Sequence, residues 1–473
     1  MPMTTAMGAS AEQIPVLIVG AGPAGLVAAA ELARHGIEPL VIERRSRGFD
    51  HPRATAISTW SMELLRSWGL EPDVRAGEVD VEWHGWRCET LSSEAGVAVP
   101  LGFPTAQQSA AVSPTSPACV PQDHLEPVLL RHARALGARV RFDAELVGLE
   151  SRPDGVRAVL RDGDGGLRTL RARYVIGADG ARSSVRAALA VPMRGPGVTL
   201  GAGSVLFRAP LWQLLGERRF GMYPITHPEV DGVFLPAGRG DRWIYGFVRE
   251  PGVLDSMALD PPAMTRLIAL GAGVPGLEPW IERIGRFAFA AELAERFRDG
   301  NTFLVGDAAH RVTPRGGTGM NMAIRGGYDI GWKLAWVLRG WADTRLLDSY
   351  EHERMPLAEH NVARSNDADG SVSDVVDELH VDLGGRIPHA WVDTDDGRRS
   401  TLDLLGPGLT LFTGPAAYAS PGPAPPIYGT ASVTVRRLPA LTARTLGIGA
   451  AGALLVRPDG VPARVAEPAA AAA

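Results

Sequence analysis

The clearest pattern of apolar and polar positions lies near the amino terminus. Residues 16–19 form a short apolar strand, and the glycine-rich turn at 20–25 leads from it into a helix rich in alanine and leucine. Gly36 is placed to end this helix, and residues 39–42 form a second apolar strand closed by Glu43. The pattern predicts two strands and a connecting helix packed as one βαβ unit.

The same alternation returns in later parts of the chain. Residues 125–136 have helical periodicity, and residues 139–142 and 156–160 are apolar in the manner of strands. Further on, a strand over 302–305, a glycine-rich loop and a helix to about Leu338 follow one another. These segments predict a sheet of parallel strands covered by helices.

Residues 190–285 have a different character. They hold many aromatic residues among prolines and glycines, and apolar and polar positions alternate in runs such as 233–235 and 242–248. Alternation with a period of two is typical of antiparallel strands with one buried face. This part of the chain predicts a separate antiparallel sheet that faces the ligand.

Composition and charge narrow the class of protein. Apolar residues make up 45% of the 473 positions, charged residues 21%, and the formal net charge is −5, which offers no basic field for nucleic acid. No apolar run reaches membrane length, and the first residues lack the features of a secretory signal. We therefore expect a cytoplasmic protein that binds neither nucleic acid nor a membrane. Cys88 and Cys119 have no metal-ligand spacing, so no metal site is expected.

The turn between the first strand and the first helix has the spacing of a dinucleotide fingerprint. Gly20 permits a tight turn, Gly22 lets backbone N–H groups approach a pyrophosphate, and Gly25 lets the helix pack closely on the strand. Glu43, at the end of the second strand, is placed to accept hydrogen bonds from ribose hydroxyls. The pattern predicts dinucleotide binding without distinguishing FAD from NAD.

Two further motifs place an aspartate after an apolar strand. The first is Val175-Ile-Gly-Ala-Asp179-Gly, which runs into a helix that begins near Ser183. The second is Phe303-Leu-Val-Gly-Asp307, in which the carboxylate would hold sugar-alcohol hydroxyls at the edge of the sheet. Residues 314–321 follow as a glycine-rich loop that leads into a helix amino terminus, a favourable site for an anionic ring edge.

In this order and at these separations, the three motifs resemble those of the FAD-dependent aromatic hydroxylases. These are the single-component (group A) flavoprotein monooxygenases typified by para-hydroxybenzoate hydroxylase and phenol hydroxylase. The closer resemblance is to the bacterial branch that modifies polyketides in antibiotic biosynthesis, supported by His51-Pro-Arg53-Ala and Pro121-Gln122-Asp-His-Leu-Glu126. The tail, with Ser400-Thr-Leu-Asp403 and Leu454-Leu-Val-Arg457, resembles that branch's truncated thioredoxin-like domain and has no CxxC.

The resemblance implies a fold of mixed class, α/β with α+β. It comprises a Rossmann-like, glutathione-reductase-like FAD-binding domain, an inserted antiparallel substrate domain and a carboxy-terminal thioredoxin-like domain. The expected ranges are 14–80, 105–189 and 286–384 for the FAD-binding domain, 81–104 and 190–285 for the substrate domain, and 385–465 for the thioredoxin-like domain.

The resemblance also assigns residues to the two ends of FAD. Residues expected at the ADP, pyrophosphate and ribityl parts are Gly22, Ala24, Glu43, Arg53, Gln122, Leu146 and Asp307, with Leu146 contacting adenine through its backbone. Asp179 belongs to a motif associated with both FAD and the pyridine nucleotide. Backbone N–H groups expected at the pyrimidine end of the isoalloxazine come from Gly317, Gly319, Met320 and Asn321, with Pro314 and His310 close to the flavin.

The chemistry implied is that of the cofactor. Non-covalent FAD is reduced by NADPH or NADH that binds transiently, and dioxygen then forms a flavin C4a-hydroperoxide that hydroxylates an aromatic, polycyclic substrate. No catalytic side chain is identified, and the histidines are expected to be structural. Aromatic and apolar residues proposed for the substrate pocket are Phe207, Phe220, Met222, Tyr223, Phe234, Trp243 and Tyr245.

Three questions stay open at the level of sequence. The same scaffold supports Baeyer–Villiger insertion or epoxidation, and a non-catalytic, redox-sensing flavin module is an alternative of another class. The protein is expected to be a monomer or a homodimer. Finally, Arg325-Gly326-Gly327-Tyr328-Asp329 departs from the family's pattern, and two glycines inside a helix cost about 1 kcal/mol each relative to alanine while permitting close backbone approach.

Overall fold

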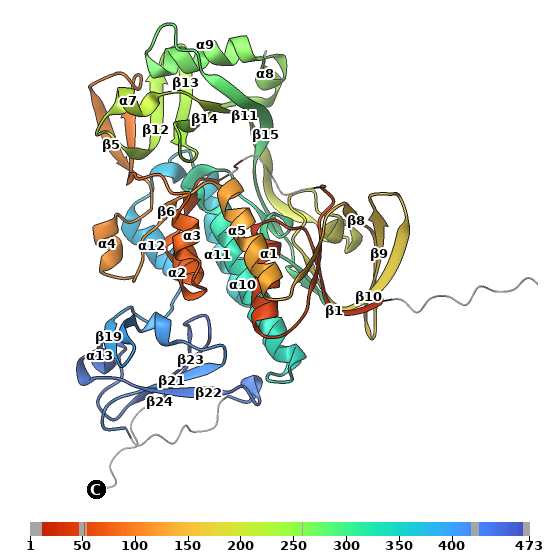
Figure 1. Cartoon of the computed structure of the whole chain (residues 1–473). Coiled ribbons are helices and arrows are strands. Elements are labelled where there is room, and N and C mark those ends of the chain that lie inside the picture. Colours follow the sequence, from red (N-terminus) through yellow and green to blue (C-terminus); the bar gives the residue numbers. More distant parts are fainter. Residues whose placement is uncertain (1–11, 47–51, 53, 258, 418–424, 467–473) are drawn as a thin grey trace, which may run out of the picture.

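The computed structural model describes residues 12–46, 52, 54–257, 259–417 and 425–466. Figure 1 shows a central body of sheet and helices, a second sheet above it, and a smaller carboxy-terminal sheet below it. The fold class expected from the sequence is confirmed by this arrangement. Among the described residues, no helix combines the length and the apolar character needed to cross a membrane.

The central sheet is built on five parallel strands in the order β17-β10-β1-β2-β7. Their bounds are β1 (Glu12–Val19), β2 (Leu40–Ile42), β7 (Arg139–Arg141), β10 (Leu167–Gly177) and β17 (Thr302–Leu304). Antiparallel strands β16 (Arg298–Asp299), β9 (Gly155–Asp162) and β8 (Ala144–Arg152) extend it. Val16, Leu17 and Ile18 are all fully buried although successive side chains point to opposite faces, so both faces of the sheet are covered.

Helices α1 (Pro23–Arg34), α5 (Gln122–Ala135) and α10 (Gly319–Leu338) lie side by side in the central body (Figure 1). Shorter elements complete it: β3 (Ala56–Ile57), β6 (Ala118–Cys119), α2 (Thr59–Ser67), α3 (Glu71–Arg75), α4 (Ala106–Ala110), α6 (Ser184–Ala188), α11 (Asp348–Asn366) and α12 (Val375–Leu383).

The glycines of α10 allow it to pack directly on α1. A Cβ at Gly327 would clash with the backbone carbonyl of Ala24, and a Cβ at Gly331 would lie 2.9 Å from the Cβ of Glu31. Despite its glycines, α10 is continuous, and nearly all of it is buried. The departure at Arg325–Asp329 therefore produces a close helix contact and no break in the helix.

The second sheet has the order β18-β15-β11-β14-β13-β12-β4-β5. Its strands are β4 (Glu82–Cys88), β5 (Gly96–Pro100), β11 (Met193–Arg208), β12 (Phe220–His227), β13 (Val230–Pro236), β14 (Arg242–Arg249), β15 (Trp280–Ala294) and β18 (His310–Arg311). All neighbouring pairs are antiparallel except β12 and β4, which are parallel. The sheet continues beyond residue 285, because β15 extends to Ala294. Helices α7 (Leu211–Leu215), α8 (Pro251–Ser256) and α9 (Pro261–Ala272) accompany it (Figure 1).

The carboxy-terminal body has a mixed sheet in the order β22-β21-β23-β24 and a separate hairpin. Its elements are β19 (Trp391–Thr394), β20 (Gly397–Ser400), β21 (Leu409–Thr413), β22 (Val433–Arg437), α13 (Ala440–Thr445), β23 (Ala453–Val456) and β24 (Pro462–Ala466). Both cysteines of the chain, Cys88 and Cys119, lie outside this body.

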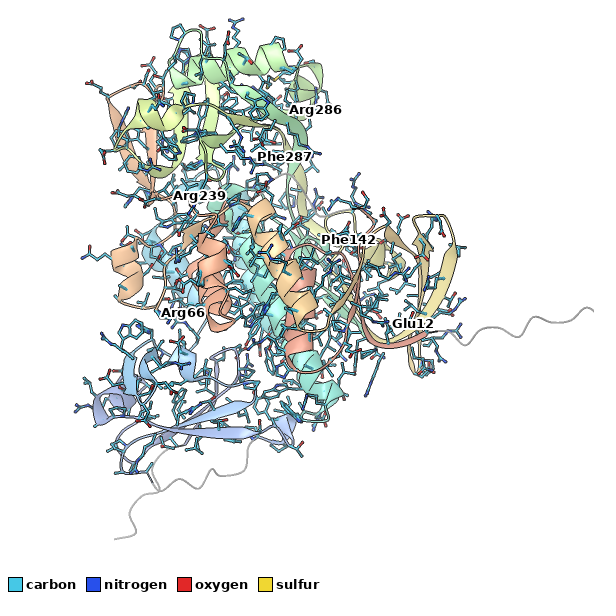
Figure 2. All side chains as sticks on the ribbon, in the orientation of Figure 1. Glu12, Arg66, Phe142, Arg239, Arg286 and Phe287 are labelled. Atoms are coloured by element: carbon cyan, nitrogen blue, oxygen red, sulfur yellow. The ribbon has the colours of Figure 1, made fainter. Side chains whose placement is uncertain are left out.

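Buried ion pairs join the carboxy-terminal body to the central one. Arg386 pairs with Glu63 of α2 through two contacts of 2.6 and 2.8 Å, and both side chains are at most 8% exposed. Arg66 of α2, labelled in Figure 2, reaches Asp403 at 3.2 Å. Paired charges of this kind fix orientation, because separating them would leave a charge without its partner in a dry environment.

The contact between α1 and α10 gives a test of the fold. Gly327→Ala is expected to lower the free energy of unfolding by about 1–3 kcal/mol, since the new methyl group forces the two helices apart. Chemical denaturation measures this. Gly252→Ala in α8 is the matched control, because a Cβ there meets nothing within 4 Å. Equal stability of the two variants would contradict the packing described here.

Candidate functional site

The parallel sheet brings the sequence motifs to one edge. Val19 pairs in register with Ile42 on one side and with Gly177 on the other, and Gly177 pairs with Leu304. These four residues end their strands, so the segments that follow them emerge together at the carboxyl edge. The segments carry Gly20, Glu43, Asp179 and Asp307, which come from four distant parts of the sequence.

The glycine turn has the shape that a pyrophosphate needs. Gly20 has φ +107°, and a Cβ there would clash with the carbonyl of Ala178, while a Cβ at Gly25 would clash with the carbonyl of Gly20 itself. A Cβ at Gly22, by contrast, meets nothing within 4 Å. Gly22 is the N-cap of α1 and has no side-chain cap, so the first N–H groups of the helix face open space. These residues fit a bound pyrophosphate.

Glu43 is buried at the end of β2 and is tied to the glycine turn. The Ala21 N–H donates to Glu43 Oε2 at 3.1 Å, and the Arg45 N–H donates to Oε1 at 3.1 Å. A carboxylate has about four acceptor positions, so these bonds leave capacity for ribose hydroxyls. Glu43 therefore stabilises the glycine turn and can also accept hydrogen bonds from a ligand beside it.

Asp307 follows a glycine that is packed between the first turn of α1 and the second turn of α10. The preceding Gly306 has φ +63°, and a Cβ there would lie 3.3 Å from the Cβ atoms of both Ala24 in α1 and Ala323 in α10. The segment after β17 is thus inserted where α1 meets α10. Asp307 is half-buried there.

The amino terminus of α10 extends beyond that of α1. Gly327 packs on the first turn of α1, and Gly319 begins α10 eight residues earlier, which is roughly 12 Å along a helix. Gly316 and Gly317 have φ of +79° and +63°, conformations that favour glycine. Within the described part of the chain no side chain caps α10, which leaves its first N–H groups for a ligand.

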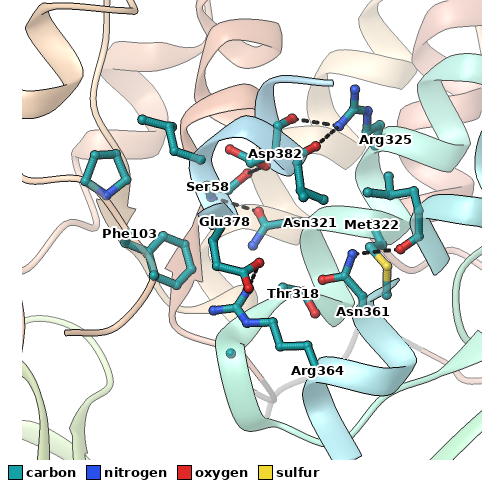
Figure 3. Close-up of a pocket in the computed structure, with 16 residues that line it drawn as sticks. Ser58, Phe103, Thr318, Asn321, Met322, Arg325, Asn361, Arg364, Glu378 and Asp382 are labelled. Carbon is teal, nitrogen blue, oxygen red and sulfur yellow. Dashed lines mark hydrogen bonds and ion pairs between the residues drawn. The ribbon is translucent and has the colours of Figure 1, made fainter. Parts of the chain in front are cut away.

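The Asn321 side chain is engaged in holding this loop. Its Oδ1 accepts from the Ser58 N–H at 2.8 Å (Figure 3). Its Nδ2 donates to the carbonyls of Ala56 and Gly317 at 3.1 and 3.0 Å. These bonds use only the side chain of Asn321, so they are compatible with the expected hydrogen bond from its backbone N–H to the flavin. Met320 precedes it in the buried first turn of α10, and Pro314 begins the loop.

The Asp179 carboxylate forms hydrogen bonds with residues close to it in the sequence. It accepts hydrogen bonds from Ser183 Oγ at 2.5 Å, Ser184 Oγ at 2.9 Å and the Val185 N–H at 3.1 Å. These contacts fix the start of α6 at the carboxyl edge of the sheet. The aspartate thereby shapes this part of the edge.

Of the other residues expected at the cofactor, two are described by the structure and one is not. Gln122 begins α5, and its Nε2 donates to Glu126 at 2.6 Å. Leu146 is buried in β8, two residues after Ala144, whose N–H donates to the carbonyl of Glu43. Arg53 lies outside the described residues.

His310 is buried in β18, the edge strand of the second sheet. Its strand pairs with Leu293 of β15, and the ring lies 6.1 Å from that of Phe297. Burial lowers the pKa of His310 to about 4, so the ring is neutral near pH 7. Within the described residues its Nδ1 has no hydrogen-bond partner.

Most of the aromatic residues proposed for the substrate pocket form the core of the second sheet. Five of them have no exposed surface and pack in one cluster with Met264 and Ile268 of α9. These five are Phe207, Tyr223, Phe234, Trp243 and Tyr245. Phe220 is half-buried and stacks on Trp86 with ring centroids 5.5 Å apart.

The opposite face of the same strands is only partly covered. Because side chains alternate, Leu206, Met222, Leu235 and Ile244 point away from α9. Met222 and Leu235 keep part of their surface exposed. Leu206, Leu235 and Ile244 were not predicted from the sequence as pocket residues. Alternation separates the two faces of a strand but does not indicate which face is covered.

A small cavity lies behind the loop that begins α10 (Figure 3). Its free volume is about 50 Å³, which is too small for a ring system and sufficient for a few water molecules. Phe103, Arg364 and Asp382 line it together with Thr318 and Asn321. Nothing in the local sequence around Phe103, Arg364 or Asp382 indicated this position.

Comparison with known families agrees with this geometry. Residues 13–365 match the family described as FAD binding domain, and residues 380–473 match the family described as aromatic-ring hydroxylase, C-terminal. Together these matches cover most of the chain.

Relatives with described activities are similar over nearly the whole length. The chain is 35% identical to aklavinone 12-hydroxylase of Streptomyces peucetius, over 91% of this chain and 98% of that protein. It is 32% identical to tetracenomycin A2 monooxygenase-dioxygenase of Streptomyces glaucescens, over 97% and 94%.

The fold is similar to that of solved structures with bound FAD. The crystal structure of aklavinone-11 hydroxylase with FAD and aklavinone matches with a TM-score of 0.89 and 32% identity, over 97% of this chain and 96% of that one. The flavin-dependent monooxygenase PieE in complex with FAD and substrate matches with a TM-score of 0.85 and 25% identity, over 96% of each chain. From its sequence motifs, its fold and these relatives, the chain belongs to the FAD-dependent aromatic-ring hydroxylases.

Proposed function

We propose that this protein is an NAD(P)H-dependent monooxygenase that hydroxylates a polycyclic aromatic substrate of the polyketide type. The observation that carries the proposal is the spacing of two uncapped helix amino termini at one sheet edge, with Asp307 between them. This arrangement suits an extended flavin dinucleotide, whose central pyrophosphate is anionic and whose flavin ring becomes anionic on reduction. The substrates named for the relatives supply the class of substrate.

Each part of the site is assigned a role in holding FAD. Gly22 and Ala24 at the start of α1 hold the pyrophosphate, and Glu43 accepts from the ribose. Asp307 accepts from the ribityl hydroxyls. The backbone N–H groups of Gly319 and of the residues that follow it bind the pyrimidine edge of the flavin.

The reaction relies on the cofactor and on its surroundings. Bound FAD supplies the reduction of dioxygen and the transfer of one oxygen atom. The first turn of α10 stabilises negative charge on the ring edge that it contacts, through its dipole and free N–H groups. The second sheet covers the site and limits the access of water, so that reducing equivalents are not lost.

The substrate is expected to lie against the face of the second sheet that is opposite α9. Met222 and Leu235 give this face an apolar, partly exposed surface, which suits the faces of fused rings. The salt bridge of 2.8 Å between Arg242 and Asp123 joins the sheet to the start of α5, which helps to fix its position over the site.

The first test follows the oxygen atom. Purified holoprotein supplied with NADPH or NADH, labelled dioxygen and a panel of polycyclic phenols that includes aklavinone is expected to yield a product with one labelled oxygen on an aromatic carbon. Mass spectrometry and NMR of the product measure this. A labelled oxygen inserted next to a ketone would instead show Baeyer–Villiger chemistry, and a holoprotein that oxidises neither nucleotide would contradict the proposal.

A second test concerns Glu43. Glu43→Ala is expected to weaken FAD binding by roughly tenfold or more, because it removes both the ribose acceptor and the bond to the Ala21 N–H. Fluorescence titration of the apoprotein with FAD gives the dissociation constant. Glu38→Ala, at an exposed position four residues before the end of β2, is the control. Unchanged affinity in Glu43→Ala would reject this role.

A third test concerns the neutral state of His310. Its pKa in the folded protein, about 4, is below the ordinary value near 6.5, so the unfolded chain binds an additional proton between these values. Stability should therefore fall on acidification from about pH 7 to about pH 4, by up to ~1.4 kcal/mol per pH unit from this residue.

The comparison uses His310→Gln, which is expected to show a shallower loss of unfolding free energy with acidification than the wild type. Denaturant unfolding at several pH values measures the slope. His352→Gln changes a histidine at the surface and should retain the wild-type slope. The same slope in His310→Gln as in the wild type would show that the ring is not held neutral.

A further inference from the structure

A carboxylate near the end of the central body contacts the start of α2, close to the loop that begins α10. Asp382 lies in the last turn of α12, within the part of the chain that matches the carboxy-terminal family. Its Oδ1 accepts from Ser58 Oγ at 2.7 Å, and its Oδ2 accepts from the Trp60 N–H at 3.1 Å. Asp382 therefore holds the amino terminus of α2, where its charge is favourable.

Ser58 links Asp382 to Asn321, which holds the flavin loop. While its hydroxyl is held by Asp382, its backbone N–H donates to Asn321 Oδ1 at 2.8 Å. The Asn321 amide in turn donates to the carbonyl of Gly317 at 3.0 Å. Figure 3 shows Asp382, Ser58 and Asn321 in this order. One continuous chain of hydrogen bonds thus joins α12 to Gly317.

The backbone of Asp382 is itself fixed from α10. Arg325 Nη1 donates to the carbonyls of Asp382 and Val381 at 2.6 and 3.3 Å, which satisfies the end of α12. The guanidinium lies 4.9 Å from the ring centroid of Trp60. Gly384 follows with φ +62°, and a Cβ there would clash with Arg325. Arg325, which departs from the family's pattern, thus joins α10 to the end of α12.

We propose that Asp382 is a positioning residue for the cofactor: through Ser58 and Asn321 it sets the conformation of the loop from Gly316 to Gly319 that receives the flavin. The inference rests on the proposed function. It assigns the end of α12, which begins the part of the chain that matches the carboxy-terminal family, an indirect part in cofactor binding. Loss of the carboxylate leaves α2 and Asn321 without their common support, so the loop samples conformations that bind FAD less well.

The test measures FAD affinity in Asp382→Ala and in a matched control. Asp377→Ala removes a carboxylate from an exposed position on the same helix. We expect Asp382→Ala to weaken FAD binding by about tenfold or more in fluorescence titration, and Asp377→Ala to bind as the wild type does. Asp382→Asn retains part of the hydrogen bonding, so it should recover part of the affinity and of the visible absorption spectrum of the bound flavin.

A second variant guards against a simple loss of folding. Ser58→Ala breaks the chain at its middle and should weaken binding to a similar extent. Combined with Asp382→Ala it should cause little further loss, because both substitutions interrupt the same chain. Circular dichroism of each apoprotein verifies that the fold is retained.

The outcomes separate this inference from the proposed function. If Asp382→Ala and Ser58→Ala bind FAD as tightly as Asp377→Ala while Glu43→Ala does not, the positioning role is overturned and the proposed site stands. If the effects of Asp382→Ala and Ser58→Ala add fully, the two residues act independently and the chain of contacts is overturned. A wild-type protein without affinity for FAD would instead refute the proposed function.

Discussion

The close packing of α10 on α1 is the constraint on which the rest of the site depends. Gly327 brings the backbone of α10 against that of Ala24, and no larger residue fits there without moving one of the helices. Because helices are stiff, fixing this one contact fixes the separation of their amino termini. The two ends of the proposed cofactor site are therefore held at a set distance by backbone packing, and flexible side chains play no part in setting it.

The central sheet and helix α12 both position the residues around these two helices. Strands in register bring Gly20, Glu43 and Asp307 to the edge at which the helices begin. Arg325 connects α10 to the end of α12, and Asp382 connects α12 to Ser58 at the start of α2. The site is thus assembled from the whole length of the chain, which agrees with relatives that are similar over nearly all of it.

The local parts of this site were predictable from the sequence, and the distant contacts were not. The glycine turn and Glu43 follow from a short βαβ pattern in which each residue has a steric or electrostatic reason for its place. The aromatic residues of the second sheet show the limit, because alternation identifies two faces but cannot tell which one α9 covers; Tyr223 and Trp243 are core, and Leu235 lies on the other face. Long-range contacts leave no local signal at all. Asp382 and Ser58 are 324 positions apart, and each has an ordinary local explanation as a helix residue or a helix cap.

The most direct test of the central claim, that the two helix amino termini hold the pyrophosphate and the flavin ring of the cofactor, is a crystal structure of the protein with FAD. We predict that the pyrophosphate lies within hydrogen-bond distance of the N–H groups at the start of α1. The pyrimidine edge of the flavin should meet those at the start of α10, with Asp307 on the ribityl chain between them. FAD bound with its flavin ring away from the amino terminus of α10 in every conformer would contradict this claim.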